Sequence, residues 1–156
     1  MITYRQFQIG EENDVCGLIS EIFDEFVAPD YSEEGVQEFY RYANAEALVA
    51  RRGDEVFCLV AESSGRLVGM IEMLACAHIS LLFVRERGKG IAKELFNRAL
   101  ARCKKERPGI SELTVNSSRY AVSIYERLGF RTIDKEQEKN GIIFIPMRYA
   151  VCQDPS

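Results

Sequence analysis

One strand-to-helix junction, LLFVRERGKGIAKELF at residues 81–96, constrains the fold of this chain more than any other segment. An apolar run typical of a buried strand ends at Val84, and a basic loop with two glycines follows. The loop leads into apolar residues at helical spacing up to about Glu106, after which a Pro-Gly pair ends the helix. Residues 111–117 then return to a strand pattern. A strand, a crossover helix and a second strand predict parallel neighbours in one sheet.

Patterns on either side of this unit predict further strands and helices, with a hairpin turn at Asn140-Gly141. Strands are predicted at residues 2–8, 55–62, 66–75, 78–84, 111–117, 130–134 and 141–151. Helices are predicted from about Val15 until Pro29, from a Ser32 cap to Arg52, from about Gly88 to Glu106, and from a Ser117 or Ser118 cap to Leu128. The order β-α-α-β-β-β-α-β-α-β-β predicts an α/β (α+β) fold, a mixed central β-sheet flanked by helices, in a single domain over residues 1–156.

The net charge and the numbers of cysteine and histidine residues argue against some classes of ligand. The chain has 156 residues and a net charge of −4, which argues against nucleic acid, because phosphate binding needs a basic footprint. Its five cysteines form no CxxC pair and it has one histidine, so we predict no metal site. Scattered cysteines, no long apolar span and no signal-peptide pattern predict a cytoplasmic protein that does not contact a membrane.

The glycine loop predicts an anion site. Gly88 and Gly90 remove side chains where a helix begins, and the first amides of a helix have no partners within it. Arg85, Arg87 and Lys89 add full positive charges around the same point. Phosphate or pyrophosphate is the natural ligand of such a junction, although the loop matches neither the Walker A nor the GxGxxG pattern. The alternative is a plain turn with exposed cations.

A second motif lies in the segment VNSSRYAVSIYERLGFRTID, residues 115–134. With the loop, it resembles the GNAT superfamily of acetyl-CoA-dependent N-acetyltransferases. The family loop reads Q/R-x-x-G-x-G/A, and Arg85, Gly88 and Gly90 match it. The family helix reads roughly A-x-x-L/I-Y-x-x-x-G-F, and its matches are Ala121, Ile124, Tyr125, Gly129 and Phe130. The chain departs from the family in the short Val84–Gly88 connection and in Ser118, where many members carry Asn.

The resemblance implies transfer of an acetyl group from acetyl-CoA to a primary amine. It implies that the strand before the loop pairs through its backbone with the pantetheine arm. The residues expected to bind the cofactor are Leu82, Phe83, Val84, Arg85, Arg87, Gly88, Lys89, Gly90, Ile91, Ala92, Asn116 and Ser118. The resemblance also places Tyr125 at the sulfur of the cofactor, as the general acid that protonates the departing thiolate. The alternative for Tyr125 is a purely structural place in the core, beside Ile124 and Leu128.

A general base is needed because only a neutral amine attacks the thioester. His78 is our first candidate, since an imidazole titrates near neutrality. It lies six residues before Val84, so both side chains should face the same way. The matching position carries a catalytic Glu in the histone-type acetyltransferases that this strand resembles. The alternatives are a buried structural His78, with Glu72 or water as the base.

The acceptor amine is not identified by the sequence, and both a small molecule and a peptide stay open. The resemblance implies an acceptor pocket formed by the first two helices and the last hairpin, which supply Phe26, Tyr31, Phe39, Tyr40, Phe144 and Met147, with Asp24, Glu25, Asp30, Glu33 and Glu34 nearby. One rival function is a catalytically silent acyl-CoA-binding sensor or regulatory module, which would not need Tyr125. Another is an interaction domain with neither ligand. A homodimer is possible, as in many members of the family.

Overall fold

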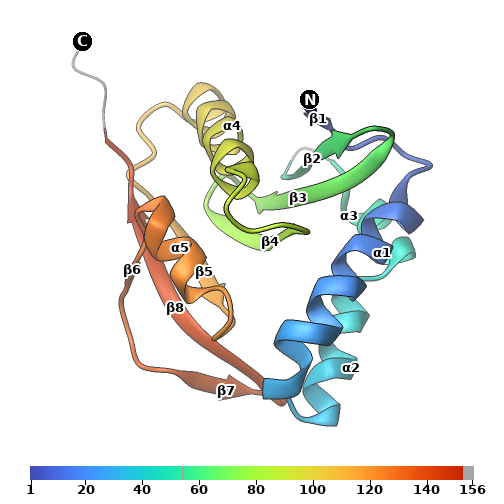
Figure 1. The fold of residues 1–156 in the computed structure, drawn as a ribbon. Helices are drawn as coiled ribbons and strands as arrows, with labels where there is room; N and C mark the ends of the chain where they lie inside the picture. The colour runs from blue at the N-terminus through green and yellow to red at the C-terminus, as the bar shows by residue number, and fades with distance from the viewer. Residues whose placement is uncertain (54, 153–156) are drawn as a thin grey trace.

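The structure is a computed structural model that describes residues 1–53 and 55–152. One mixed sheet runs through it in the order β1-β2-β3-β4-β5-β8-β6, and β7 pairs with β8 (Figure 1). Its strands are β1 (Ile2–Gln6), β2 (Val56–Ser63), β3 (Arg66–Leu74), β4 (His78–Val84), β5 (Glu112–Ser117), β6 (Arg131–Thr132), β7 (Gln137–Lys139) and β8 (Ile142–Ala150). Neighbouring strands are antiparallel except β4 and β5, which are parallel. The predicted mixed sheet and its parallel pair are confirmed.

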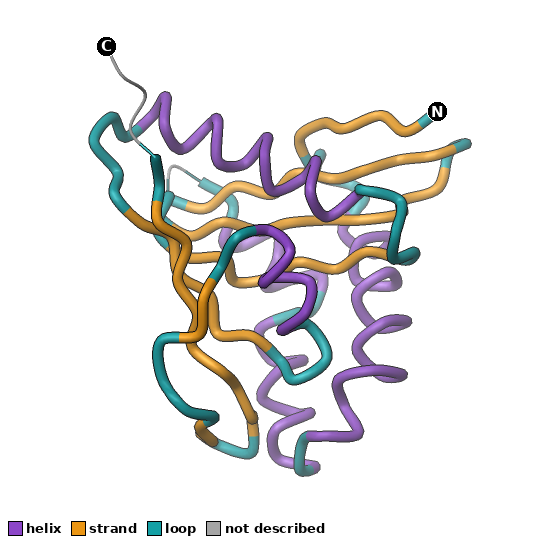
Figure 2. The backbone as a smooth tube through the Cα atoms, turned by 60° about the vertical axis from the view of Figure 1, so that its left-hand side comes forward, coloured by secondary structure: helices purple, strands orange, loops and turns teal. Residues whose placement is uncertain are grey.

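Helices cover both faces of this sheet (Figures 1 and 2). They are α1 (Glu12–Ile22), a π-helical segment η1 (Phe23–Val27), a 3-10 turn η2 (Ala28–Asp30), α2 (Glu33–Tyr42), α3 (Ala45–Arg51), α4 (Ile91–Glu106) and α5 (Val122–Leu128). The side chains of α4 and α5 pack with one core cluster of the sheet. The side chains of α1 and α3 pack with a second cluster on the other face. This arrangement agrees with the predicted flanking helices.

The first helix differs from its prediction at its C-terminal end. Instead of continuing to Pro29 as one α-helix, it widens into the π-helical turn η1. A π turn takes more residues than an α turn, so it rotates the side chains that follow. Phe23 is completely buried, whereas Phe26 is 43% exposed and stacks on the ring of Tyr120 at 4.6 Å between centroids.

The second predicted helix, from the Ser32 cap to Arg52, is two helices in the structure. Ala43 leaves the helical region with φ −103° and ψ 59°, and this ends α2. The Asn44 side chain then accepts a hydrogen bond from the Ala47 amide at 2.9 Å and caps α3. Asn competes well for amides at a helix start, which explains the break. The Ser32 cap is confirmed by its hydrogen bond from the Gly35 amide at 3.1 Å.

A close approach of two backbones fixes α2 against the last hairpin. A Cβ built on Gly35 would lie 2.0 Å from the carbonyl oxygen of Gly141. Gly141 is in the β7–β8 turn, where Asn140 and Gly141 both have positive φ, 52° and 81°. This confirms the predicted hairpin turn, since such turns require positive φ at both central residues. Of the strand predicted at 130–134, only Arg131–Thr132 pairs in the sheet.

Candidate active site

The parallel strands β4 and β5 separate soon after they meet. They pair only at His78 with Thr114 and at Ile79 with Val115. Beyond these two positions a cavity of about 330 Å³ opens between the strands and continues beneath α1 and α2. We call it the central cavity. Most of its lining is apolar or aromatic, as is typical of pockets that bind small molecules.

Eight residues of the predicted site line the central cavity, although they come from four helices or strands and one turn. They are His78, Leu82, Phe83, Val84, Ala92, Asn116, Ser118 and Tyr125. The Oγ of Ser118 also accepts a hydrogen bond from the Ala121 amide at 3.2 Å, in the turn before α5. Ser118 therefore stabilises the turn and also borders the cavity, so a structural role and a contact with a cofactor are compatible.

The glycine loop borders a second cavity of about 230 Å³, the loop cavity. Gly88 and Gly90 have φ values of 81° and 74°, a region that side chains rarely adopt, and an added Cβ would meet nothing within 4 Å at either position. The first amides of α4 have no partners within the helix, so this junction is suited to an anion. The cations of Arg87, Lys93 and Arg127 line the same cavity. Glycines, amides and cations together fit a diphosphate such as that of coenzyme A.

Lys93 and Arg127 are cations of the loop cavity that the sequence analysis missed. Lys93 lies three residues after Gly90, in the first turn of α4. Its position beside the loop could have been recognised from the sequence. Arg127 lies at the end of α5, and nothing in its local sequence points to the loop. It reaches the loop cavity only because the fold packs α5 beside α4.

Two of the predicted loop cations lie elsewhere. The guanidinium of Arg85 donates to the Leu67 carbonyl at 3.0 Å and forms an ion pair with Glu21. Arg85 thereby lines a separate groove of about 550 Å³ beside α1. Lys89 is exposed and lines none of these three spaces.

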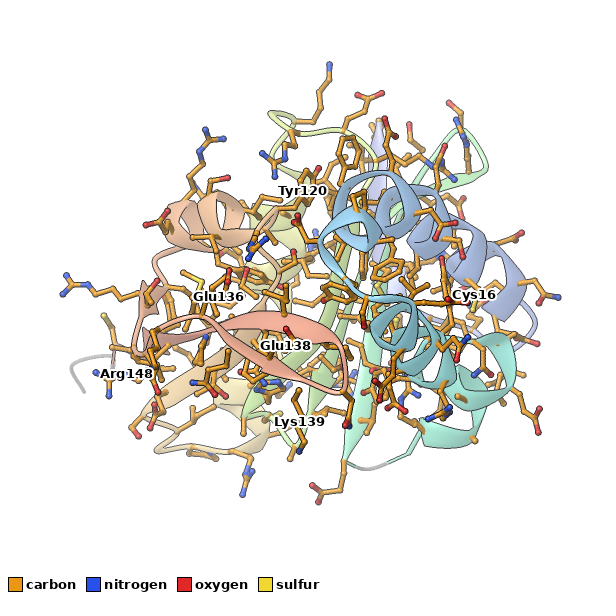
Figure 3. All side chains as sticks on the ribbon, turned by 90° about the horizontal axis from the view of Figure 1, so that it is seen from below. Cys16, Tyr120, Glu136, Glu138, Lys139 and Arg148 are labelled. Carbon is orange, nitrogen blue, oxygen red and sulfur yellow. The ribbon has the colours of Figure 1, made fainter. Side chains whose placement is uncertain are left out.

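Arg87 ties the loop to the turn before α5. It donates to the Tyr120 carbonyl at 2.7 Å, and its guanidinium lies 4.1 Å over the Tyr120 ring. Phe26 stacks on the same ring from η1. Tyr120 thus lies between α5 and the end of the first helix (Figure 3), and Tyr120 borders the central cavity.

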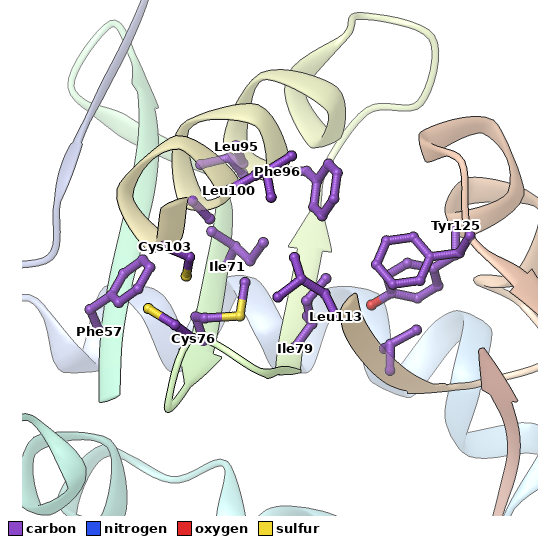
Figure 4. Packing of buried hydrophobic residues seen from close by; sticks show 14 of the residues in the cluster. Phe57, Ile71, Cys76, Ile79, Leu95, Phe96, Leu100, Cys103, Leu113 and Tyr125 are labelled. Atoms are coloured by element: carbon purple, nitrogen blue, oxygen red, sulfur yellow. The ribbon is translucent and has the colours of Figure 1, made fainter. Parts of the chain in front are cut away.

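Tyr125 is buried in α5, where its ring packs edge-on against Phe130 at 5.4 Å. Figure 4 shows its hydroxyl oxygen directed toward the strands of the sheet. Within residues 1–53 and 55–152 no hydrogen bond to this hydroxyl forms. Burial raises the pKa of the phenol well above its ordinary value, so it stays protonated. The ring packs in the core and also lines the central cavity, so the two expected roles are compatible.

His78 does not face the way that the sequence analysis predicted. A bulge in the β3–β4 pairing makes Ser80 an additional residue without a partner in β3. Ile79 and Val84 therefore pack in the same cluster, although they are five positions apart, an odd spacing that would place them on opposite faces of a regular strand. His78 consequently faces the side opposite to Val84, where its Nδ1 lies 2.8 Å from Thr114 Oγ1. Burial lowers the pKa of the imidazole below its ordinary 6.5. The side chain is mostly neutral at pH 7.

Glu72, the alternative base, is 0% exposed and does not line the central cavity. Its carboxylate forms ion pairs with Arg51, at 3.2 Å, and with Arg52. The carboxylate does not reach the cavity, and its charge is already paired with these two guanidinium groups. This geometry disfavours Glu72 as the base.

The side of the cavity beneath the first helices contains part of the expected acceptor pocket. Tyr31 and Phe39 line it, with Glu38, a carboxylate that the sequence analysis missed. The other expected aromatic and apolar residues, Phe26, Tyr40, Phe144 and Met147, do not line it. Met147 is fully buried because β8 faces the core at that position.

Comparisons with known proteins agree with this geometry. The family model described as "Acetyltransferase (GNAT) domain" matches residues 27–151. A search of curated proteins found no match.

Solved structures share the fold at low sequence identity. A GCN5-related N-acetyltransferase from Rhodopseudomonas palustris is 19% identical, with 96% of this chain and 95% of that chain covered and a TM-score of 0.80. The PaiA N-acetyltransferase from Thermoplasma acidophilum, in complex with coenzyme A, is 21% identical, with 97% and 99% covered and a TM-score of 0.79. The aminoglycoside 6'-N-acetyltransferase from Enterococcus faecium is 13% identical, with 99% of both chains covered and a TM-score of 0.68.

Membrane-spanning helices and metal-binding clusters are absent from residues 1–53 and 55–152. No helix there is long and apolar enough to cross a membrane. No three His, Cys, Asp or Glu side chains in this part gather where they could hold a metal ion.

Proposed function

Because the chain belongs to the acetyltransferase (GNAT) domain family, we propose that it is an N-acetyltransferase that transfers the acetyl group of acetyl-CoA to a primary amine of a small molecule or peptide. One observation carries the proposal. The central cavity between the splayed strands adjoins the loop cavity, since Val84, Ala92 and Ile124 line both. A single elongated ligand can therefore place an anionic group at the loop and a reactive group between β4 and β5.

The donor would lie along this path. Its diphosphate would meet the amides of the Gly88–Gly90 loop and the cations of Arg87, Lys93 and Arg127. The pantetheine arm would pair with the free backbone edge of residues 82–84, which β5 leaves unpaired after Ile79. Amides on this edge are also the groups that can polarise the thioester oxygen.

The reaction needs one proton removed and one supplied. The amine nitrogen attacks the thioester carbonyl carbon, the carbon–sulfur bond breaks, and the sulfur leaves with the bonding electron pair. Tyr125 would give its phenolic proton to the sulfur, because it lines the cavity and burial keeps it protonated. His78, neutral and on the cavity wall, would receive the proton of the amine directly or through water.

Two observations support details of the proposal. The similar structures include an N-acetyltransferase in complex with coenzyme A and an aminoglycoside N-acetyltransferase, which supports an amine as the acceptor class. All five cysteines are free, which favours the reducing cytoplasm as the location.

Thiol release from acetyl-CoA across a panel of polyamines, amino acids, aminoglycosides and peptides tests the proposal. Turnover with any amine, together with an acetylated product seen by mass spectrometry, would support it. Coenzyme A binding measured by calorimetry, without turnover for any amine of the panel, would instead favour the acyl-CoA sensor. If the protein neither binds coenzyme A nor acetylates any amine of the panel, the assignment of a CoA ligand from the family is overturned.

A further inference from the structure

A buried polar network lies directly behind the wall of the central cavity. Its centre is Glu72 of β3, which is 0% exposed. The Oε2 atom of Glu72 receives hydrogen bonds from Arg51 at 3.2 Å and from Arg52. A buried carboxylate is stable only when its charge and its lone pairs are matched, and these two guanidinium groups match them on one side.

The other oxygen of Glu72 is reached by two hydroxyl groups. Tyr42 donates its O–H to Oε1 at 2.7 Å, and Ser80 donates its O–H to the same atom at 2.6 Å. Both residues also line the central cavity. Glu72 itself does not, so the two hydroxyls stand between a hidden carboxylate and the space where a substrate would bind.

The backbone holds both hydroxyls in place. Ser80 is the additional residue of the β3–β4 bulge, and a bulge re-aims the side chain it carries. Tyr42 ends α2, and the guanidinium of Arg51 lies 3.5 Å over its ring and donates to its carbonyl at 2.6 Å. Neither side chain needs the substrate to become ordered, so the site is preorganised.

This arrangement decides which hydrogen-bond groups face the cavity. A hydroxyl has one proton and two lone pairs, and a carboxylate can only accept. Because Ser80 and Tyr42 both donate their single hydroxyl proton to Glu72, only their oxygen lone pairs are left for a ligand. The two positive charges of Arg51 and Arg52 exceed the single negative charge of Glu72, so the network offers lone pairs and carries no net negative charge.

We propose that Ser80 and Tyr42, with their hydroxyl protons held by Glu72, form an acceptor-only site that binds and orients the N–H groups of the amine substrate. The inference rests on the proposed function. A neutral primary amine has two N–H groups and one lone pair. If both N–H groups point to Ser80 and Tyr42, the lone pair is free to point toward a thioester beside residues 82–84. Glu72 is then a positioning residue, and Ser80 and Tyr42 contact the substrate.

Steady-state kinetics of Ser80→Ala and Tyr42→Phe test this inference, using the amine of the panel that the wild-type enzyme acetylates best. Each change removes one hydroxyl and keeps the surrounding shape. Loss of one hydrogen bond is expected to lower kcat/KM for the amine by about 2- to 10-fold. The KM for acetyl-CoA and the affinity for coenzyme A by calorimetry should stay at wild-type values, a split that general damage to the fold would not give.

Tyr40→Phe is the matched control. Tyr40 is on the same helix and also donates its hydroxyl to a carboxylate, that of Asp24, but it does not line the central cavity. It should leave the kinetics for the amine unchanged. If Tyr42→Phe does not fold, Ser80→Ala alone decides, because it deletes a single oxygen from a half-buried strand position.

The outcomes separate the inference from the function on which it rests. Wild-type turnover with an unchanged kcat/KM for the amine in a folded Ser80→Ala variant would overturn the inference and leave the proposed function standing. An equal loss in Tyr40→Phe would also overturn it. No turnover by the wild-type protein with any amine would overturn the proposed function and the inference together.

Discussion

Replacing Gly35 with alanine should destabilise the protein, although alanine is the better helix former. The added Cβ would lie 2.0 Å from the Gly141 carbonyl oxygen and 2.4 Å from its carbonyl carbon. A carbon and a carbonyl oxygen normally approach to about 3.3 Å at closest, so α2 must move away from the hairpin by more than 1 Å. Both contacts are with backbone, so no side-chain rotation can relieve them.

The size of the effect follows from opposing contributions. Overpacking typically costs about 1–3 kcal/mol. The displacement also weakens the hydrogen bond from the Ser32 amide to the Gly141 carbonyl, at 3.3 Å, which is worth about 1 kcal/mol. The helix gains about 1 kcal/mol when alanine replaces glycine. The free energy of unfolding should therefore fall by about 1–3 kcal/mol, or a Tm decrease of several degrees.

Urea denaturation followed by circular dichroism measures this change, and Gly17→Ala is its control. Gly17 is an exposed glycine within α1, and an added Cβ there meets nothing within 4 Å. This variant should gain about 0.5–1 kcal/mol from helix propensity alone. Opposite signs for the two variants are the expected result. A Gly35→Ala protein as stable as Gly17→Ala would refute the close approach of α2 to the hairpin.

Five further tests address the site and the fold. Tyr125→Phe should lower kcat about 10²–10⁴-fold with little change in CoA affinity; a wild-type kcat, where chemistry limits the rate, would remove the general-acid role. Because burial lowers the pKa of His78, the acidic limb of kcat/KM should lie below pH 6.5, and His78→Ala should flatten or shift it; an identical limb would exclude His78. For the same reason the unfolded chain binds more protons below pH 6.5, so stability should fall as the pH drops below 6.5, and less so in His78→Ala. Gly90→Ala and Gly65→Ala, at φ 74° and 77° with free space around both, should lose similar stability, but only Gly90→Ala should weaken CoA binding by calorimetry; equal affinities would contradict the diphosphate loop. Native alkylation should label the exposed Cys152 first, with the three buried cysteines protected until unfolding.

Much of the site could be predicted from sequence because its features are local. The glycine loop, the start of α4 and the placing of Tyr125 on α5 depend on residues within a few positions of one another. Positive φ at Gly88 and Gly90, the Ser32 cap and the Asn140-Gly141 turn follow from the same short-range rules. The strand and helix order, and with it the mixed sheet, follows from the periodicity of apolar residues.

Features that depend on distant segments could not be read in this way. His78 turned to the opposite face because one bulge in the β3–β4 pairing shifts every side chain before it, and register is a property of two strands. Phe26 lies outside the expected acceptor pocket and stacks on Tyr120, a residue of the turn before α5 that is distant in the sequence. Arg127 entered the loop cavity, and Arg85 left it for Glu21, through packing between separate elements.

Glu72 shows most clearly the difference between what local sequence predicts and what tertiary packing sets. From the sequence alone it was only an alternative candidate for the base. Only the tertiary structure brought it to Arg51 and Arg52 on α3 and its C-terminal end, and to the hydroxyls of Tyr42 and Ser80. Local propensity determines which backbone shapes a segment prefers, but burial and charge pairing depend on segments that meet only after folding. Short-range rules therefore fix the elements and the glycine loop, whereas packing between distant segments sets which polar groups line the central cavity.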